Sequence, residues 1–198
     1  MKQFVAPILC FSLVFTGVLL LLRKNEVPDP LPRYGRLPEV ILEHSSGAAF
    51  RPSQLNGTVS LWSFFFTSCE GPCPKLQAEM LKLQRRLKRT QNVQLVSVSV
   101  DHETDTPERL RAYAEKLGAR PENWSFLRAE ETPLRSLAIQ GFQVGVDPGN
   151  LIHSNRIALV DSTGEVRGLY DSTEEQKMEK LVEDTKRLVR ESASAQGS

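Results

Sequence analysis

Residues 58–87, TVSLWSFFFTSCEGPCPKLQAEMLKLQRRL, place two cysteines between an apolar run and an amphipathic run. The apolar run, Thr58–Phe66, is rich in β-branched and aromatic residues and predicts a strand that is buried on both faces. Beyond the second cysteine, apolar residues recur with the period of a helix at Leu76, Met80, Leu83 and Leu87. The stretch therefore predicts a strand, a cysteine loop and a helix, in that order.

Cys69 and Cys73 are expected at the N-terminus of this helix, because Pro72 favours a position in the first helical turn. The positive end of the helix dipole stabilises a thiolate, which makes both sulfurs candidate nucleophiles or metal ligands. A structural disulfide is the alternative, since residues at this spacing around a helix start lie within bridging distance. So small a loop removes little chain entropy, and a purely structural bridge would stabilise the fold weakly. We therefore predict that the pair is chemically active, as a dithiol/disulfide couple or as metal ligands.

The rest of the chain predicts the α/β class. Val93–Val100 is predicted to be a second buried strand, so strand, helix and strand form a right-handed βαβ unit with parallel strands. Thr106 and Pro107 are typical of a helix start, and Gly118 of its end. Further strands are expected at residues 40–42, 48–50, 124–127, 156–160 and 165–170, and further helices at 133–139 and after Ser172. These elements predict an α/β sandwich with a mixed central sheet and flanking helices.

Three more residues become candidates for the site. Asp101 follows the second strand as the cysteine loop follows the first, which places both at the carboxyl edge of one sheet, where open α/β folds bind ligands. His153 precedes the terminal hairpin. Two thiolates and one imidazole suit copper, since sulfur holds the reduced ion and nitrogen helps to hold the oxidised ion. A structural zinc site is the alternative, but it needs a fourth protein ligand, for which Asp101 or His102 would have to lie close.

The N-terminal region predicts a membrane anchor. Phe4–Leu22 is uncharged and about long enough to cross a bilayer as a helix. No small-residue cleavage site follows it, which favours a retained anchor over a cleaved signal peptide. We predict an anchor over residues 1–24, a proline-rich stalk over 25–37, one domain over 38–191 and a disordered tail over 192–198. We therefore expect a single-pass membrane protein with its domain outside the cytoplasm. No Arg- and Ser-rich transit segment precedes the anchor, which favours a bacterial periplasm over a mitochondrion.

The charge pattern argues against a nucleic-acid partner. Lysine and arginine total 25 and aspartate and glutamate 24, for a net charge of +1. The basic stretch Lys82–Arg89 is predicted to be the solvated face of the motif helix.

The motifs together resemble the Sco/SenC family, membrane-anchored thioredoxin-like proteins that deliver copper to cytochrome c oxidase. The matching stretches are Phe66–Pro74, Ser99–Glu108, Ile152–Ser154 and Ala158–Asp161, followed by Gly164. The resemblance implies a thioredoxin-like sandwich and copper, as Cu(I) and Cu(II), bound by Cys69, Cys73 and His153. It also implies that Asp101 tunes the site. The chain departs from the family pattern at Gly71–Pro72, between the cysteines, and at His102, where the family commonly has proline.

Two functions fit these residues. The first is a metallochaperone, rather than an enzyme, that passes copper to the oxidase subunit carrying the copper A site. The alternative is a thiol–disulfide oxidoreductase that reduces the cysteines of that target and is itself recycled by a thioredoxin-type reductant. His153 distinguishes the two, because disulfide exchange does not require it. A peroxidase is disfavoured, because Thr67 stands one position too close to Cys69 for a Thr-x-x-Cys motif.

Overall fold

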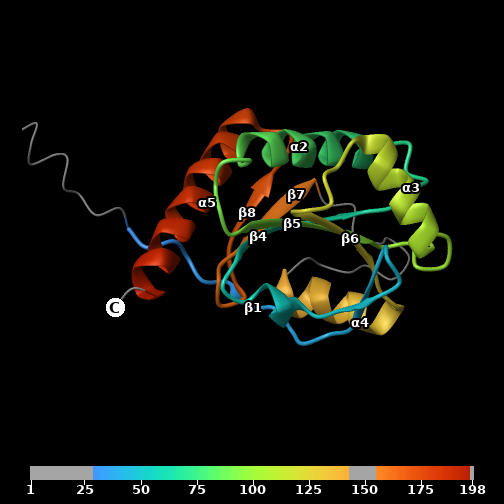
Figure 1. The fold of residues 1–198 in the computed structure, drawn as a ribbon, viewed down its shortest axis with the longest axis horizontal. Helices are drawn as coiled ribbons and strands as arrows, with labels where there is room; N and C mark the ends of the chain where they lie inside the picture. The colour runs from blue at the N-terminus through green and yellow to red at the C-terminus, as the bar shows by residue number, and fades with distance from the viewer. Residues whose placement is uncertain (1–28, 143–154, 197–198) are drawn as a thin grey trace, which may run out of the picture. The chain divides into compact units, whose positions relative to one another are not determined.

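The computed structural model describes residues 29–142 and 155–196. Within these residues one mixed sheet has the strand order β1-β8-β7-β4-β5-β6-β2-β3. The strands are β1 (Gly35–Arg36), β2 (Leu42–His44), β3 (Ala49–Phe50), β4 (Val59–Phe65), β5 (Val93–Ser99), β6 (Trp124–Arg128), β7 (Arg156–Val160) and β8 (Glu165–Asp171). The helices are α2 (Cys73–Arg86), α3 (Pro107–Leu117), α4 (Glu131–Ser136) and α5 (Glu175–Gln196), with a 3-10 turn η1 (Pro52–Leu55) and a π-helical turn η2 (Leu137–Gly141). Helices α2, α3 and α5 cover one face of the sheet, and α4 covers the other (Figure 1).

The centre of the sheet is the predicted βαβ unit. Strand β4 pairs in parallel with β5, from Val59 opposite Val93 to Phe65 opposite Ser99. On its other side β4 pairs antiparallel with β7, which makes the sheet mixed. The expected mixed sheet with flanking helices is therefore confirmed. Because β4 and β5 are parallel, the residues that follow them leave the sheet at one edge, and that edge carries the cysteine loop.

Strand β4 is buried along its whole length, as its composition predicts. Its alternate side chains enter two separate cores: Leu61 and Phe65 pack under α2, α3 and α5, while Trp62 and Phe64 pack on the α4 side. Phe65, the last residue of the strand, packs against Tyr113 of α3, with ring centroids 5.2 Å apart and ring planes tilted by 40°. The end of β4, and with it the start of the cysteine loop, is thus held by packing on both faces.

A buried polar network fixes α2 on the sheet. Gln77 lies one turn after Cys73 and has no exposed surface. Its side-chain amide donates to Ser63 Oγ (3.3 Å), and its carbonyl oxygen accepts from Ser97 Oγ (2.9 Å). Trp124 Nε1 donates to the same Ser97 oxygen (3.0 Å). Because each buried polar group has a partner, this network sets the register of the helix over β4 and β5.

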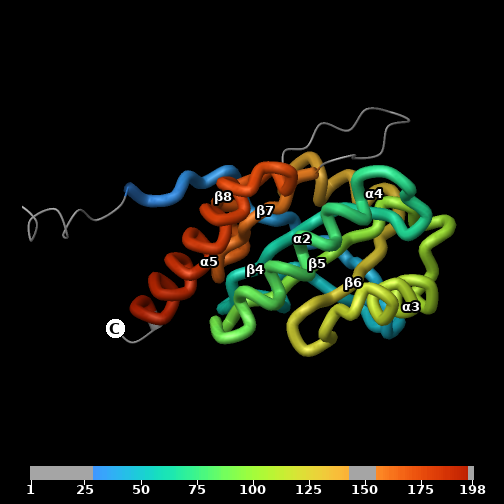
Figure 2. The backbone as a smooth tube through the Cα atoms, turned by 90° about the horizontal axis from the view of Figure 1, so that it is seen from above, coloured from blue at the N-terminus to red at the C-terminus, as the bar shows by residue number. Residues whose placement is uncertain are grey.

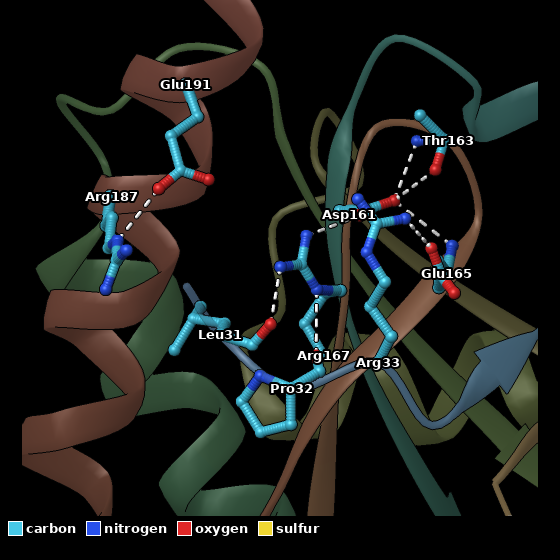
Figure 3. Close-up of polar contacts among 9 residues, drawn as sticks. All are labelled: Leu31, Pro32, Arg33, Asp161, Thr163, Glu165, Arg167, Arg187 and Glu191. Atoms are coloured by element: carbon cyan, nitrogen blue, oxygen red, sulfur yellow. Dashed lines mark hydrogen bonds and ion pairs between the residues drawn. The ribbon is translucent and has the colours of Figure 1, made fainter. Parts of the chain in front are cut away.

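Residues 31–37 differ from the expected stalk. Leu31 and Leu37 are buried, and β1 between them pairs antiparallel with β8. The buried guanidinium of Arg167 donates to the Leu31 carbonyl (2.7 Å) and the Pro32 carbonyl (2.9 Å). It also donates to Asp161 Oδ2 (2.9 Å), as Figure 3 shows. These residues belong to the compact unit, which begins at Leu31, because the two leucines place apolar area in its core.

The C-terminal helix also differs from expectation. It runs to Gln196, past the predicted start of the tail, and the hydroxyl of Ser192 donates to the carbonyl of Val189 (2.9 Å). Figure 2, viewed from above, shows α5 crossing beside β7 and β8. Across residues 29–142 and 155–196, no helix is long and apolar enough to cross a membrane. The predicted anchor over Phe4–Leu22 lies outside the residues that the structure describes.

Candidate functional site

The cysteine loop leaves β4 and enters α2 as predicted. Helix α2 begins at Cys73, and Pro72 before it already has helical dihedral angles (φ −75°, ψ −26°). The N–H of Cys69 donates to the carbonyl of Phe66 (3.3 Å), which folds the start of the loop back on the end of β4. Both cysteines are free thiols in this structure. Cys73 is buried, with 6% of its surface exposed, and Cys69 is partly exposed.

The two sulfurs are hydrogen-bonded to each other and have opposite acidities. Burial raises the pKa of Cys69, but hydrogen bonds from the Cys73 side chain and from the N–H groups of Cys73 and Gly71 outweigh it, so the net pKa lies below the usual value. Burial and the bond to Cys69 raise the pKa of Cys73 to about 12. Cys69 is therefore the first of the two to lose its proton, and its thiolate is stabilised by the hydrogen bond from the Cys73 thiol. A partly exposed thiolate beside a buried thiol is a suitable arrangement for attack on an external sulfur or for capture of a soft metal ion.

This asymmetry predicts the order of alkylation. Iodoacetamide should modify Cys69 first, because the thiolate is the nucleophile and Cys69 has the lower pKa of the two thiols. Cys73 should react only once denaturant opens the fold. Mass mapping of the labelled peptides measures both rates. Equal labelling of the two thiols in the folded protein would contradict the assignment.

The other predicted ligands are not gathered at the cysteines in the described part of the chain. There, no three His, Cys, Asp or Glu side chains are grouped so that they could hold a metal ion. His153 lies outside the described residues, so its role as a ligand stays a prediction. The imidazole of His102 faces Glu130, with 4.0 Å between Nε2 and Oε2. Asp101 accepts a bond from the N–H of Thr104 (3.1 Å) and so caps its own turn.

Sequence reasoning missed the carboxylate that does contact the cysteine loop. Asp105 has no exposed surface, and its side chain accepts bonds from both the N–H and the hydroxyl of Thr67, two residues before Cys69. In the sequence, Asp105 lies within the family-like stretch Ser99–Glu108 and just before the Thr106-Pro107 helix start, but neither pattern indicates a contact with Thr67. The cap itself is as predicted, with Thr106 Oγ1 accepting from the N–H of Arg109.

A groove of about 790 Å³ lies beside the loop, between the start of α2 and the turn from β8 to α5. Its lining includes Glu70, Pro72, Lys75 and Glu79 on one side and Ser172 and Thr173 on the other. The groove is open to solvent, and its lining begins at Glu70, the residue after Cys69.

Comparisons with known proteins agree with the fold and the motif. A family model described as SCO1/SenC matches residues 41–190. The SCO1 protein homolog of Bacillus subtilis (strain 168) is 30% identical over 168 residues, which are 82% of this chain and 86% of that protein.

Two solved structures extend the comparison. BsSco, described as a member of the Sco family of cytochrome c oxidase assembly proteins with a disulfide switch, superposes with a TM-score of 0.72 at 28% identity, covering 84% of this chain and 99% of that one. A SCO1/SenC family lipoprotein from Bacillus anthracis str. Ames gives a TM-score of 0.71 at 31% identity, with 81% and 98% of the two chains covered. The match of the family model over most of the compact unit, together with these relatives, shows that the chain belongs to the SCO1/SenC family.

Proposed function

We propose that this protein binds copper and delivers it to the copper A centre during assembly of cytochrome c oxidase. The observation that carries the proposal is the pair of hydrogen-bonded sulfurs at the carboxyl edge of the sheet, with Cys69 partly exposed and favoured as a thiolate. Family membership supports it, because a relative of the same family is described as a cytochrome c oxidase assembly protein.

The chemistry of the donors fits copper as cargo. Cys69 and Cys73 supply two soft sulfur ligands, which suit Cu(I), and His153 is the proposed nitrogen ligand that helps to hold Cu(II). Copper binding requires Cys73 to lose its proton, so uptake of the ion releases protons. A site of few ligands with one sulfur near solvent allows the thiolates of the target to replace its own ligands one at a time. Asp101 is proposed to tune this site, and a thioredoxin-type thiol reductant to keep the pair reduced.

Exchange of His153 for alanine tests the ligand set. In the reduced full chain, His153→Ala should remove the thiolate-to-copper absorption of the Cu(II) complex while Cu(I) stays bound, because two thiolates alone can hold the reduced ion. Titration with each oxidation state, followed by absorption and by competition with a chelator, measures the two affinities.

The chain's other histidines provide matched controls. His44 bonds to Ser46 through Nδ1 and His102 faces Glu130, so His44→Ala and His102→Ala should bind Cu(II) like the parent. Parental Cu(II) binding by His153→Ala would remove it from the ligand set. If the reduced parent bound neither oxidation state, copper delivery itself would be excluded.

A thiol–disulfide oxidoreductase is the second candidate, and the opposite acidities of the two cysteines favour it. The Cys69 thiolate would attack one sulfur of a target disulfide, forming a mixed disulfide and releasing the other target sulfur as a thiolate. Cys73 would then lose its proton and attack Cys69, which releases the second target thiolate and leaves an internal disulfide. The target is reduced by two electrons, and the thioredoxin-type reductant restores the pair.

We further propose that residues 1–24 anchor the protein in a membrane, with the domain on the extracytoplasmic side. The uncharged run Phe4–Leu22 supports this proposal. The Bacillus anthracis relative is described as a lipoprotein, and such a protein is also attached to a membrane. An extracytoplasmic position would bring the site to the side on which a membrane-bound oxidase receives copper.

A further inference from the structure

The buried carboxylate of Asp105 connects the end of β5 to the cysteine loop. Its Oδ2 accepts from the N–H of Thr67 (2.9 Å) and from Ser99 Oγ (2.5 Å), and its Oδ1 accepts from the Thr67 hydroxyl. The same residue is tied to its own loop, because its N–H donates to the carbonyl of Asp101 (2.9 Å). One side chain thus joins the segments that follow the two central parallel strands.

The site requires a group that only accepts hydrogen bonds. Within the described residues, all three hydrogen bonds to the carboxylate come from donors. A charge with no exposed surface persists only when its oxygens are satisfied. Arg109 completes the arrangement: its Nε donates to Thr67 Oγ1 (2.7 Å) and lies 3.7 Å from Asp105 Oδ1. Because Arg109 takes a lone pair of the hydroxyl, the hydroxyl proton is directed at Asp105.

Thr67 lies where a displacement would reach both sulfurs. The backbone of Phe66, immediately before it, contacts each cysteine: the Phe66 carbonyl accepts from the N–H of Cys69, and the Phe66 N–H donates to the sulfur of Cys73. Thr67 therefore stands between Phe66, which contacts both cysteines, and Cys69 itself. Fixing its N–H and its hydroxyl on one buried carboxylate fixes the path of the loop that presents the two sulfurs together.

We propose that Asp105 is a positioning residue for the Cys69–Cys73 pair, holding the loop so that the two sulfurs are presented together, whether to a copper ion or to each other. The part of this inference that concerns copper affinity rests on the proposed function. The part that concerns the Cys69–Cys73 disulfide is independent of copper. Asp101 has a different role. Its carboxylate accepts a hydrogen bond within its own turn, and its backbone carbonyl accepts one from the N–H of Asp105. Asp105 is the member of this loop whose side chain contacts the cysteine segment.

The test is the substitution Asp105→Asn in the full chain. The amide keeps the shape of the side chain but turns a donor toward Thr67 or Ser99, so one of the three bonds is lost and the loop loosens. The equilibrium in which two glutathione molecules reduce the Cys69–Cys73 disulfide to the dithiol and form oxidised glutathione should shift about tenfold toward the dithiol. That shift corresponds to a reduction potential about 30 mV higher. Affinity for Cu(I) should fall about ten- to a hundredfold, as is typical when a partner that orients metal ligands is lost.

Two further variants separate positioning from charge and from stability. Thr67→Val keeps the carboxylate and the Thr67 N–H bond but removes the hydroxyl, so it should shift the glutathione equilibrium in the same direction by a smaller factor. Asp184→Asn removes a different buried carboxylate, which accepts from Tyr170 on α5's side of the sheet. It should leave the equilibrium of the cysteine pair at the parental value even if it lowers the melting temperature.

The outcomes distinguish the proposals. A parental glutathione equilibrium in both Asp105→Asn and Thr67→Val would overturn the positioning role, as would a shift in Asp105→Asn alone, since that result assigns the effect to charge. A shift of equal size in Asp184→Asn would assign it to general destabilisation and would also overturn the role. If Asp105→Asn does not fold, the positioning role is tested by comparing the glutathione equilibria of Thr67→Val and Asp184→Asn. A shift in Thr67→Val alone supports the role, and its absence overturns it. A parent that binds no copper but shows the expected disulfide shifts would refute the proposed function while leaving Asp105 as a positioning residue.

Discussion

Replacing Cys69 by serine is expected to abolish both proposed activities of the site, copper binding and disulfide exchange. A hydroxyl is neither a soft metal ligand nor able to form a disulfide, so the variant loses one of two sulfur ligands and the whole redox couple. Loss of a residue that only orients the metal ligands weakens metal binding by up to about a hundredfold. Loss of a direct ligand should weaken Cu(I) binding by more than that. Cys73→Ser should give the same result. Chelator competition and titration of free thiols after mild oxidation measure the two effects.

Cys10 is the matched control for the cysteine variants. It is the third cysteine of the chain and lies in the uncharged N-terminal run, where its simplest role is that of a small apolar residue. Cys10→Ser should bind copper like the parent and should still lose two free thiols on mild oxidation. Retention of tight Cu(I) binding by Cys69→Ser would exclude sulfur ligation by the pair.

Replacing Arg167 by methionine should give the largest loss of stability. The side chains of Arg167 and Asp161 are almost fully buried and are 2.9 Å apart. Removing one partner of such a pair leaves a buried charge without compensation and costs about 3–5 kcal/mol of the free energy of unfolding. The carbonyls of Leu31 and Pro32 would lose their donors as well. Urea unfolding followed by circular dichroism measures the change.

An exposed ion pair provides the control for this substitution, and the pH dependence of stability provides a second measurement. Lys82 pairs with Glu79 on the open face of α2, so Lys82→Met should change the free energy of unfolding by about 0–1 kcal/mol. Burial raises the pKa of Asp161, but hydrogen bonds from Thr163 and Arg167 bring it below the usual value. The resulting stability is present above the pKa of the unfolded aspartate and is lost as the pH falls through the folded pKa. An Arg167→Met variant as stable as the parent at neutral pH would show that this cluster does not hold the N-terminal segment.

Local patterns in the sequence were sufficient for the sheet and the helices around the site. Three local patterns each predict one element: the apolar run of β4, the helical stripe of α2 and the Thr106-Pro107 cap of α3. The βαβ rule then places β4 and β5 in parallel, as observed. Membership of the Sco/SenC family is confirmed as well, since its motifs are short and lie in order along the chain. These features depend on neighbours in sequence, which is why they could be predicted.

The contacts that were missed join residues distant in sequence. Asp105 and Thr67 are 38 positions apart, and Arg167 reaches a carbonyl 136 positions away. No periodicity signals that a particular aspartate or arginine will be buried with partners from another segment. The prolines at positions 28, 30 and 32 predicted a stalk, whereas Leu31 and Leu37 are buried in the compact unit. The ligand role of His153 remains a prediction, because that residue lies outside the described ranges.

The two outermost strands of the sheet, β1 and β3, are two residues long each. Unpaired backbone groups on a long outer strand attract other chains, and very short outer strands limit that risk. Strand β1 pairs with β8 at Glu165 and Val166, so removing residues 31–37 would free the backbone groups of these two residues for intermolecular pairing. For a protein proposed to present a thiol pair to other chains, such short outer strands favour contact at the cysteine loop over pairing along the edge of the sheet.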